Sequence, residues 1–155
     1  MRKILLTLTA LALIGCENKE TAVVTTYDPA LTMIETMNLV LDPAADVIWG
    51  SSGWDITAEG EKELWPETEE GWNQLIHAAG VVTEAGNLLK MPGRLHGADG
   101  RGEDWIAYSQ AITDTGKQLL KASQEREKQA IFDLGGQLYR ICVACHSRYV
   151  YSESE

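Results

Sequence analysis

The residues best suited to chemistry lie near the C-terminus, in the run Cys142-Val143-Ala144-Cys145-His146. In this C-x-x-C-H pattern the two thiols and the imidazole stand at positions i, i+3 and i+4, which share one face of an α-helix. Both thiols can then form thioether bonds to the vinyl groups along one haem edge, while His146 ligates the iron as proximal ligand. The spacing therefore predicts one covalent haem c, held by Cys142, Cys145 and His146.

Other uses of paired cysteines fit this sequence less well. A bare C-x-x-C is also found in thiol redox pairs and as one half of a zinc site. The histidine directly after the second cysteine, and the lack of a second cysteine pair in the sequence, argue against both. No Ser-His-Asp set, metal-binding cluster or phosphate-binding loop is recognisable, so the sequence predicts that the protein is not an enzyme.

The N-terminal residues have the pattern of an export signal. Two basic residues precede an apolar stretch, residues 4–14, that is too short to span a bilayer. Positions 13–16 (Leu-Ile-Gly-Cys) resemble a bacterial lipobox, which predicts a lipoprotein signal peptide over residues 1–15 and lipidation of Cys16. The alternative is an ordinary secretory signal with an incidental cysteine. Both predict export, and we expect a periplasmic protein held at the membrane by its lipid.

The composition fits one globular domain and excludes one class of partner. The 155 residues are 45% hydrophobic and include five Trp. The formal charge of −10 becomes −12 once a signal peptide has removed Arg2 and Lys3. A chain this acidic should not bind nucleic acid through phosphate contacts and is repelled by anionic lipid, so membrane attachment would come from the anchor. Its charge suits a basic redox partner, although solubility alone also explains it.

The first half of the chain reads as a tether, a helix and a long connection. Residues 16–27 are polar and predict a short tether, followed by the domain over residues 28–155. Asp28-Pro29 predicts an N-cap and first helical residue, and apolar residues at spacings of three and four predict a helix ending near Gly50. Pro43 predicts a kink or a break in it. Residues 50–68 form a connection whose two Trp, at 54 and 65, should fold back onto the helices.

Three further helices follow. Thr68 marks the start of one that should stop at Met91-Pro92-Gly93, and the next should begin near Glu103 after a Gly-rich loop. A polar corner at residues 123–126 leads into the last helix, which carries the C-x-x-C-H run. No continuous β pattern is recognisable. The sequence therefore predicts an all-α fold, an antiparallel four-helix bundle with covalently bound haem.

Three stretches connect the chain with a known class. They are residues 37–49 (MNLVLDPAADVIW), 84–94 (EAGNLLKMPGR) and 138–149 (LYRICVACHSRY). Over roughly residues 28–151 the chain resembles the cytochrome c-prime class of bacterial cytochromes, in which a four-helix bundle carries C-x-x-C-H near the end of its last helix. Many members have an arginine four residues after the proximal histidine. Val150 stands there in this chain, so the role of that arginine is not transferred.

The resemblance also implies a distal ligand from the first helix. It aligns Met37 with the ligand-supplying methionine of six-coordinate members, which implies a His/Met-ligated electron carrier. Met33, one turn earlier, is the alternative ligand, and without the resemblance a methionine on a core face is usually packing. If neither ligates, the iron is five-coordinate and binds small gases such as nitric oxide. The class often dimerises, so a homodimer is a further expectation, although no sequence stripe identifies its interface.

Two histidines and two arginines are weaker candidates. His77 could be a distal ligand, but a hydrogen-bonded or rim position is the stronger expectation, and His96 should be exposed in a Gly-rich loop. Arg94 and Arg140 either pair with haem propionates or make ordinary surface salt bridges. The aromatic residues expected to pack in the bundle core are Trp49, Trp72, Trp105 and Tyr139.

Overall fold

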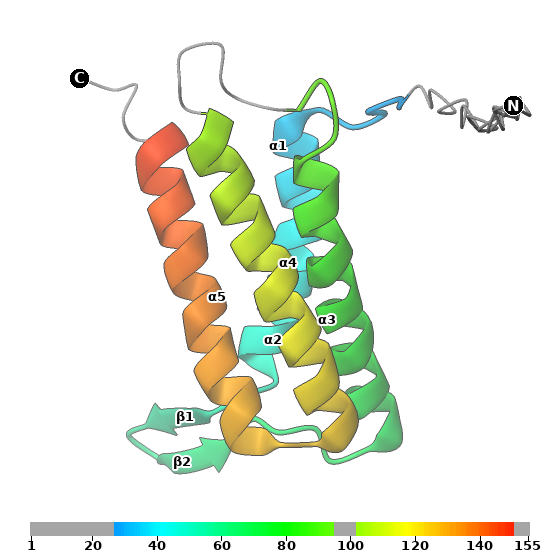
Figure 1. Cartoon of the computed structure of the whole chain (residues 1–155). Coiled ribbons are helices and arrows are strands. Elements are labelled where there is room, and N and C mark those ends of the chain that lie inside the picture. The colour runs from blue at the N-terminus through cyan, green and yellow to red at the C-terminus, as the bar shows by residue number, and fades with distance from the viewer. Residues whose placement is uncertain (1–26, 95–101, 151–155) are drawn as a thin grey trace, which may run out of the picture.

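The computed structural model describes residues 27–94 and 102–150, which form an antiparallel helical bundle (Figure 1). Three short elements stack end to end as the first long helix, and three long helices follow. The predicted all-α bundle is therefore confirmed for its helices. Their bounds are α1 Met33–Thr36, the π-helix η1 Met37–Leu41, α2 Asp42–Gly50, α3 Glu69–Leu89, α4 Gly102–Glu125 and α5 Lys128–Tyr149.

Several predictions concern residues outside the described part of the chain. The signal peptide over residues 1–15, lipidation at Cys16, nearly all of the tether and the exposed position of His96 belong to this group. They stay predictions.

The first helix begins later than the sequence suggested. Thr32, not Asp28, is the N-cap: its hydroxyl accepts from the Glu35 N–H at 3.3 Å, and the Glu35 carboxylate accepts from the Thr32 N–H at 2.9 Å. This reciprocal capping box satisfies two backbone donors that a helix start leaves free. Asp28 instead accepts from the Ala30 N–H in a tight turn. The box at Thr32 therefore overrides the Asp-Pro signal.

Pro43 changes the winding of this helix without ending it. Proline has no N–H, so the usual hydrogen bond from residue 43 to the Leu39 carbonyl cannot form. The preceding turn widens to the π-helix Met37–Leu41, in which the Asp42 N–H donates to the Met37 carbonyl, five residues back. The helix then continues as α2 to Gly50, so the predicted end is confirmed and the predicted kink takes the form of a π segment.

The connection after Gly50 contains a β-hairpin that the sequence analysis did not predict. Strands β1 (Trp54–Thr57) and β2 (Gly60–Glu63) pair antiparallel, with Thr57 opposite Gly60. The expectation of no β structure is wrong because both strands are short and fully exposed, which leaves no long apolar alternation to read. The connection does fold back as predicted: Trp65 is buried, and the Trp54 ring meets Phe132 edge-on at 5.7 Å.

The other helix ends follow their sequence signals. Thr68 caps α3 by accepting from the Gly71 N–H at 3.1 Å, and Gly93 takes the positive φ of 88° that the turn after α3 requires. Helix α4 begins one residue before Glu103. Arg126, with φ of 56°, makes the corner between α4 and α5.

Helices α3 and α4 form the tightest pair in the bundle. A Cβ on Gly116 would lie 2.7 Å from the Thr83 backbone, and one on Gly86 would lie 2.6 Å from the Ser109 carbonyl oxygen. The buried hydroxyls at this contact are satisfied within their own helices, such as Thr83 donating to the Ala79 carbonyl at 2.8 Å. Only residues without a side chain permit this approach, so the two glycines fix the distance between the helices.

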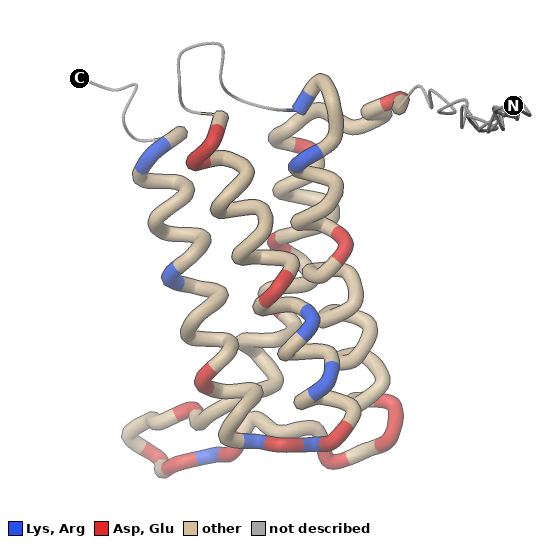
Figure 2. Tube along the Cα trace, viewed as in Figure 1, with Lys and Arg blue, Asp and Glu red and all other residues tan. Residues whose placement is uncertain are grey.

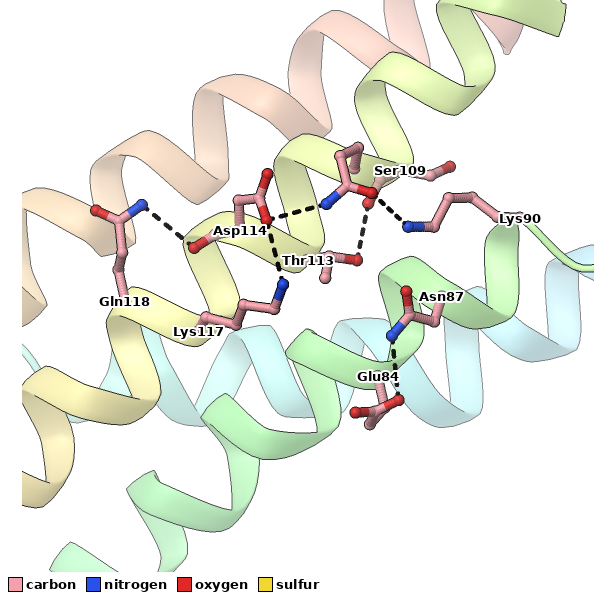
Figure 3. A network of polar contacts seen from close by, with 9 residues as sticks. Glu84, Asn87, Lys90, Ser109, Thr113, Asp114, Lys117 and Gln118 are labelled. Carbon is pink, nitrogen blue, oxygen red and sulfur yellow. Dashed lines mark hydrogen bonds and ion pairs between the residues drawn. The ribbon is translucent and has the colours of Figure 1, made fainter.

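Polar contacts bridge the edge of the same pair. Lys90, the residue directly after α3, donates to Gln110 of α4 at 2.7 Å, and Gln110 donates in turn to Asp114 at 2.9 Å (Figure 3). At the hairpin end of the bundle, basic and acidic residues alternate (Figure 2). There Arg126 pairs with Glu69 at 2.5 Å and lowers the pKa of that carboxyl. Because the pair is exposed, it stabilises the fold little.

Within the described residues, no helix has the length and apolar character needed to cross a membrane.

The close approach of α3 and α4 predicts opposite effects for two glycine-to-alanine changes. Gly116→Ala should lower the free energy of unfolding by about 1–3 kcal/mol, because its new methyl group meets the Thr83 backbone. Gly80→Ala is the matched control on α3. No atom lies within 4 Å of its new Cβ, so it should raise stability by up to about 1 kcal/mol through helix propensity. Urea unfolding followed by circular dichroism measures both, and equal effects would contradict the tight contact.

Candidate functional site

Helix α5 presents the C-x-x-C-H residues on one side. The helix runs without interruption to Tyr149, so both cysteines and His146 lie within its regular part. Cys145 is buried and Cys142 half-buried, and both are free thiols. Val143 and Ala144 between them are exposed. The predicted common face therefore exists, and the sulfur-bearing side of the helix turns toward the bundle interior.

Burial keeps these two thiols protonated. It raises the pKa of each to about 11, with the nearby Asp42 carboxylate adding to the effect at Cys142. Thiol redox pairs depend on a lowered pKa that yields a thiolate near neutral pH, and zinc binds cysteine as the thiolate. The environment of this pair works against both alternatives.

The first helix and α5 stand apart at the end that carries the motif. Near the hairpin end the two are in contact: the Trp49 indole N–H donates to the Gly135 carbonyl at 3.0 Å. Toward the other end, no Cα of α1 or η1 comes within 8 Å of a Cα of α5. Figure 1 shows α1 and the C-terminal end of α5 at the same end of the bundle. The helices therefore diverge where Cys142, Cys145 and His146 face inward.

Aromatic rings fix the end of α5 against α4. The Tyr149 ring, one turn beyond His146, meets the Trp105 ring edge-on at 5.0 Å and the Tyr108 ring at 6.4 Å. Trp105 is buried, and its indole N–H donates to the Leu89 carbonyl at 2.8 Å. Arg148 and Asp104 add an ion pair at 3.2 Å. This cluster joins three helices and gives His146 a rigid support.

Two methionines lie on the first helix. Met33 and Met37 are half-buried and both pack against the core, one at the start of α1 and one at the start of the π segment. Thr36 between them is buried. In this part of the first helix, no Cα of α1 or η1 comes within 8 Å of a Cα of α5. The packing leaves the choice between Met33 and Met37 open.

Arg94 lies in the segment that follows α3, and its side chain reaches the start of the first helix. Its guanidinium donates to the Thr36 hydroxyl and, at 3.0 Å, to the Leu31 carbonyl. Its Nε is buried and has no hydrogen-bond partner among the described residues. A buried guanidinium N–H without a partner is unfavourable unless an acceptor completes it. The surface salt bridge considered for Arg94 is not formed within residues 27–94 and 102–150.

The remaining candidates lie on the surface. Arg140 is exposed beside an open groove of about 680 Å³, which Trp49 and Tyr139 also line. His77 is exposed on α3, consistent with a rim position. Trp72 and Trp105 are buried as predicted and Trp49 is half-buried, whereas Tyr139 is 58% exposed, so its expected core position is wrong.

Thr36 and Tyr149 were missed as site residues. Each had a signal in its position: Thr36 interrupts the apolar face between the two methionines, and Tyr149 follows His146 by one turn. The partners of these two residues, Arg94 and Trp105, are distant in sequence, which is why spacing alone did not reveal the contacts.

Within the described ranges, no three His, Cys, Asp or Glu side chains gather as a group that could hold a metal ion. Comparison of the chain with family models, with curated proteins and with solved structures finds no match. The interpretation of the site therefore rests on its own residues.

Proposed function

We propose that the protein is a periplasmic monohaem c-type cytochrome of the c-prime type, anchored by lipid and acting as an electron carrier. The observation that carries the proposal is the C-x-x-C-H run on an unbroken helix, with its thiols turned inward where that helix diverges from the first one. A four-helix bundle builds cofactor sites from side chains on facing helices in this way. The haem would supply one-electron redox chemistry.

The residues present fit such a cofactor. Cys142 and Cys145 would hold it by thioether bonds and His146 would ligate its iron, while the Trp105 and Tyr149 rings keep α5 in place. The orphaned Nε of Arg94 is the kind of buried donor that an acidic group of a cofactor completes. The protein's part is then to fix the ligands and to exclude water from the iron.

On the distal side we assign ligation to Met37, as the resemblance to six-coordinate c-prime cytochromes implies. A methionine ligand raises the reduction potential and suits electron transfer. Met37 begins the π segment that Pro43 imposes, and such widened turns are frequent at functional sites. Met33 is the alternative ligand, and a distal side without a ligand would instead favour binding of small gases.

Partner and location follow from charge and from the N-terminus. The acidic chain favours a basic redox protein as partner, and it disfavours nucleic acid. Cys16 would carry the lipid that keeps the protein at the membrane after export. A homodimer remains an expectation of the resemblance.

Covalent attachment is the first test. Protein matured in a periplasm should retain haem through acid–acetone extraction, because thioether bonds survive it, and its mass should increase by one haem. Cys142→Ser and Cys145→Ser should each leave a single thioether, and the double variant should release all haem on extraction. The pyridine haemochrome spectrum separates one bond from two. Complete extraction of haem from the wild type would refute the proposal.

The identity of the distal ligand can be read from spectra. Ferric wild type should be low-spin and show the weak near-infrared sulfur-to-iron charge-transfer band. Met37→Ala should abolish that band, shift the iron toward high-spin and open it to carbon monoxide. Met33→Ala is the matched control one turn away: it should keep the band and cost about 2 kcal/mol, the low end for such a truncation because Met33 is half-buried.

Two outcomes would redirect this assignment. Loss of the band in Met33→Ala alone would make Met33 the ligand. A high-spin wild type that binds carbon monoxide readily would make both methionines packing residues, and gas binding would become the leading function.

The anchor has a separate test. Wild type should fractionate with membranes, since two or three acyl chains on Cys16 give stable attachment where one does not. Cys16→Ser should move the protein to the soluble periplasm while leaving its haem spectrum unchanged. Wild type already soluble in the periplasm would overturn the lipobox interpretation and leave the cytochrome proposal intact.

A further inference from the structure

The least satisfied buried group at this site is the guanidinium of Arg94. Its two terminal nitrogens donate to the Thr36 hydroxyl of α1 and to the carbonyl of Leu31, just before that helix. Thr36 cannot turn away, because its hydroxyl also donates to the Thr32 carbonyl at 2.8 Å. These contacts fix the plane of the guanidinium and leave the buried Nε–H pointing to no acceptor.

Both acceptors already in place are neutral. A hydroxyl and a carbonyl bind a guanidinium through hydrogen bonds, but they do not compensate its charge. Arg94 as a whole is half-buried, and its Nε is the atom that is buried without an acceptor. Within residues 27–94 and 102–150 no carboxylate pairs with Arg94. A carboxylate would supply both the missing acceptor and the counter-charge, and guanidinium groups bind carboxylates in preference because their donors match the two carboxylate oxygens.

The position of Arg94 restricts which carboxylate this is. Thr36 lies between Met33 and Met37, so the guanidinium is held beside the turn that would supply the distal ligand. That turn belongs to the helix segment that stands apart from α5 at the C-x-x-C-H end. A haem attached there brings two propionate groups, on the edge away from its thioether bonds.

We propose that Arg94 binds one haem propionate through its Nε–H, tying the cofactor to α1 and holding that propionate ionised. This inference rests on the proposed cytochrome function and deepens it. Arg94 is a positioning residue with an electrostatic effect. It would link α1 to the propionate edge of the haem and place a fixed positive charge beside a carboxyl group whose pKa depends on the charge of the iron.

The electrostatic effect has a definite sign. Reduction of the iron adds one negative charge, which raises the pKa of a nearby propionate, so the reduction potential falls with pH between the propionate pKa values of the oxidised and reduced states. A guanidinium beside the propionate lowers both pKa values and moves this window to acid pH. Without Arg94, burial raises both pKa values, and the window moves toward neutral pH.

Arg140 provides the matched control. It is also an arginine near the motif, two residues before Cys142, but its side chain is exposed beside the Tyr139 groove. Water screens its charge, so its removal should not move the window.

The experiment is a spectroelectrochemical titration of the reduction potential of the full haem-loaded protein from about pH 5 to pH 8, the range into which burial would bring an unpaired propionate. Wild type and Arg140→Gln should give nearly flat curves. Arg94→Gln should have a potential close to that of the wild type at the acid end, where its propionate is protonated, and a clear fall in potential as the pH rises and the propionate ionises. Arg94→Lys retains the positive charge without the Nε donor. Its reduction potential should fall at a pH between the pH values at which the potentials of the wild type and of Arg94→Gln fall.

The possible results distinguish failure of the Arg94 inference from failure of the proposed cytochrome function. If both Arg94 variants follow the wild-type curve, Arg94 only braces α1, and the inference is wrong although the cytochrome stands. If Arg94→Gln fails to fold, Arg94→Lys decides alone, and a wild-type curve for it overturns the inference. If the wild type carries no haem by its pyridine haemochrome spectrum, the proposed function itself fails.

Discussion

Helices α3 and α4 approach until the backbone of one meets the backbone of the other, and the rest of the bundle is arranged around that contact. Gly86 and Gly116 permit the approach because any side chain at either position would collide with the facing helix. A pair this close cannot shift without breaking its packing, so it acts as a rigid half of the molecule. The first helix and α5 pack onto it from outside; their backbones approach each other near the hairpin, while no Cα of α1 or η1 lies within 8 Å of a Cα of α5.

The contrast between the close α3–α4 pair and the more distant first helix and α5 bears on function, because the two pairs of helices are packed by different kinds of residue. Where helices have only to pack, small residues close the distance between them. Where the C-x-x-C-H run faces the first helix, no Cα of α1 or η1 comes within 8 Å of a Cα of α5. Met33 and Met37 extend from that part of the first helix, and the side chain of Arg94 reaches it from beyond α3. A bundle with one tight pair and one separated pair suits the proposed haem between helices better than a uniformly packed bundle would.

Local sequence signals explain most of the fold and only part of the site. The caps at Thr68 and the turn at Gly93 act through neighbouring backbone, and the shared face of Cys142, Cys145 and His146 follows from helical spacing, so each could be read from the sequence. Asp28-Pro29 gave a wrong helix start, because the Thr32–Glu35 capping box satisfies the free backbone N–H groups of a helix capped at Thr32 instead. The hairpin escaped because exposed four-residue strands carry little hydrophobic pattern. The Arg94–Thr36 contact joins residues 58 apart in sequence, a distance at which no local rule operates.

The two sides of the site also differ in how firmly they are held, and the difference follows from backbone chemistry. On the α5 side, an unbroken helix is fixed by the Trp105–Tyr149 contact one turn beyond His146, so ordinary helical geometry and aromatic packing hold this part of α5. On the other side, Pro43 removes one backbone donor and the turn that begins at Met37 is wider than an α-helix, a geometry with poorer packing of its own. Such a segment needs support from outside itself. Arg94 gives that support by binding the turn before it at two points, Thr36 and Leu31. If Met37 is the ligand proposed above, its position therefore depends on the contact that Arg94 makes from beyond the end of α3, whereas the position of His146 depends on the geometry of α5.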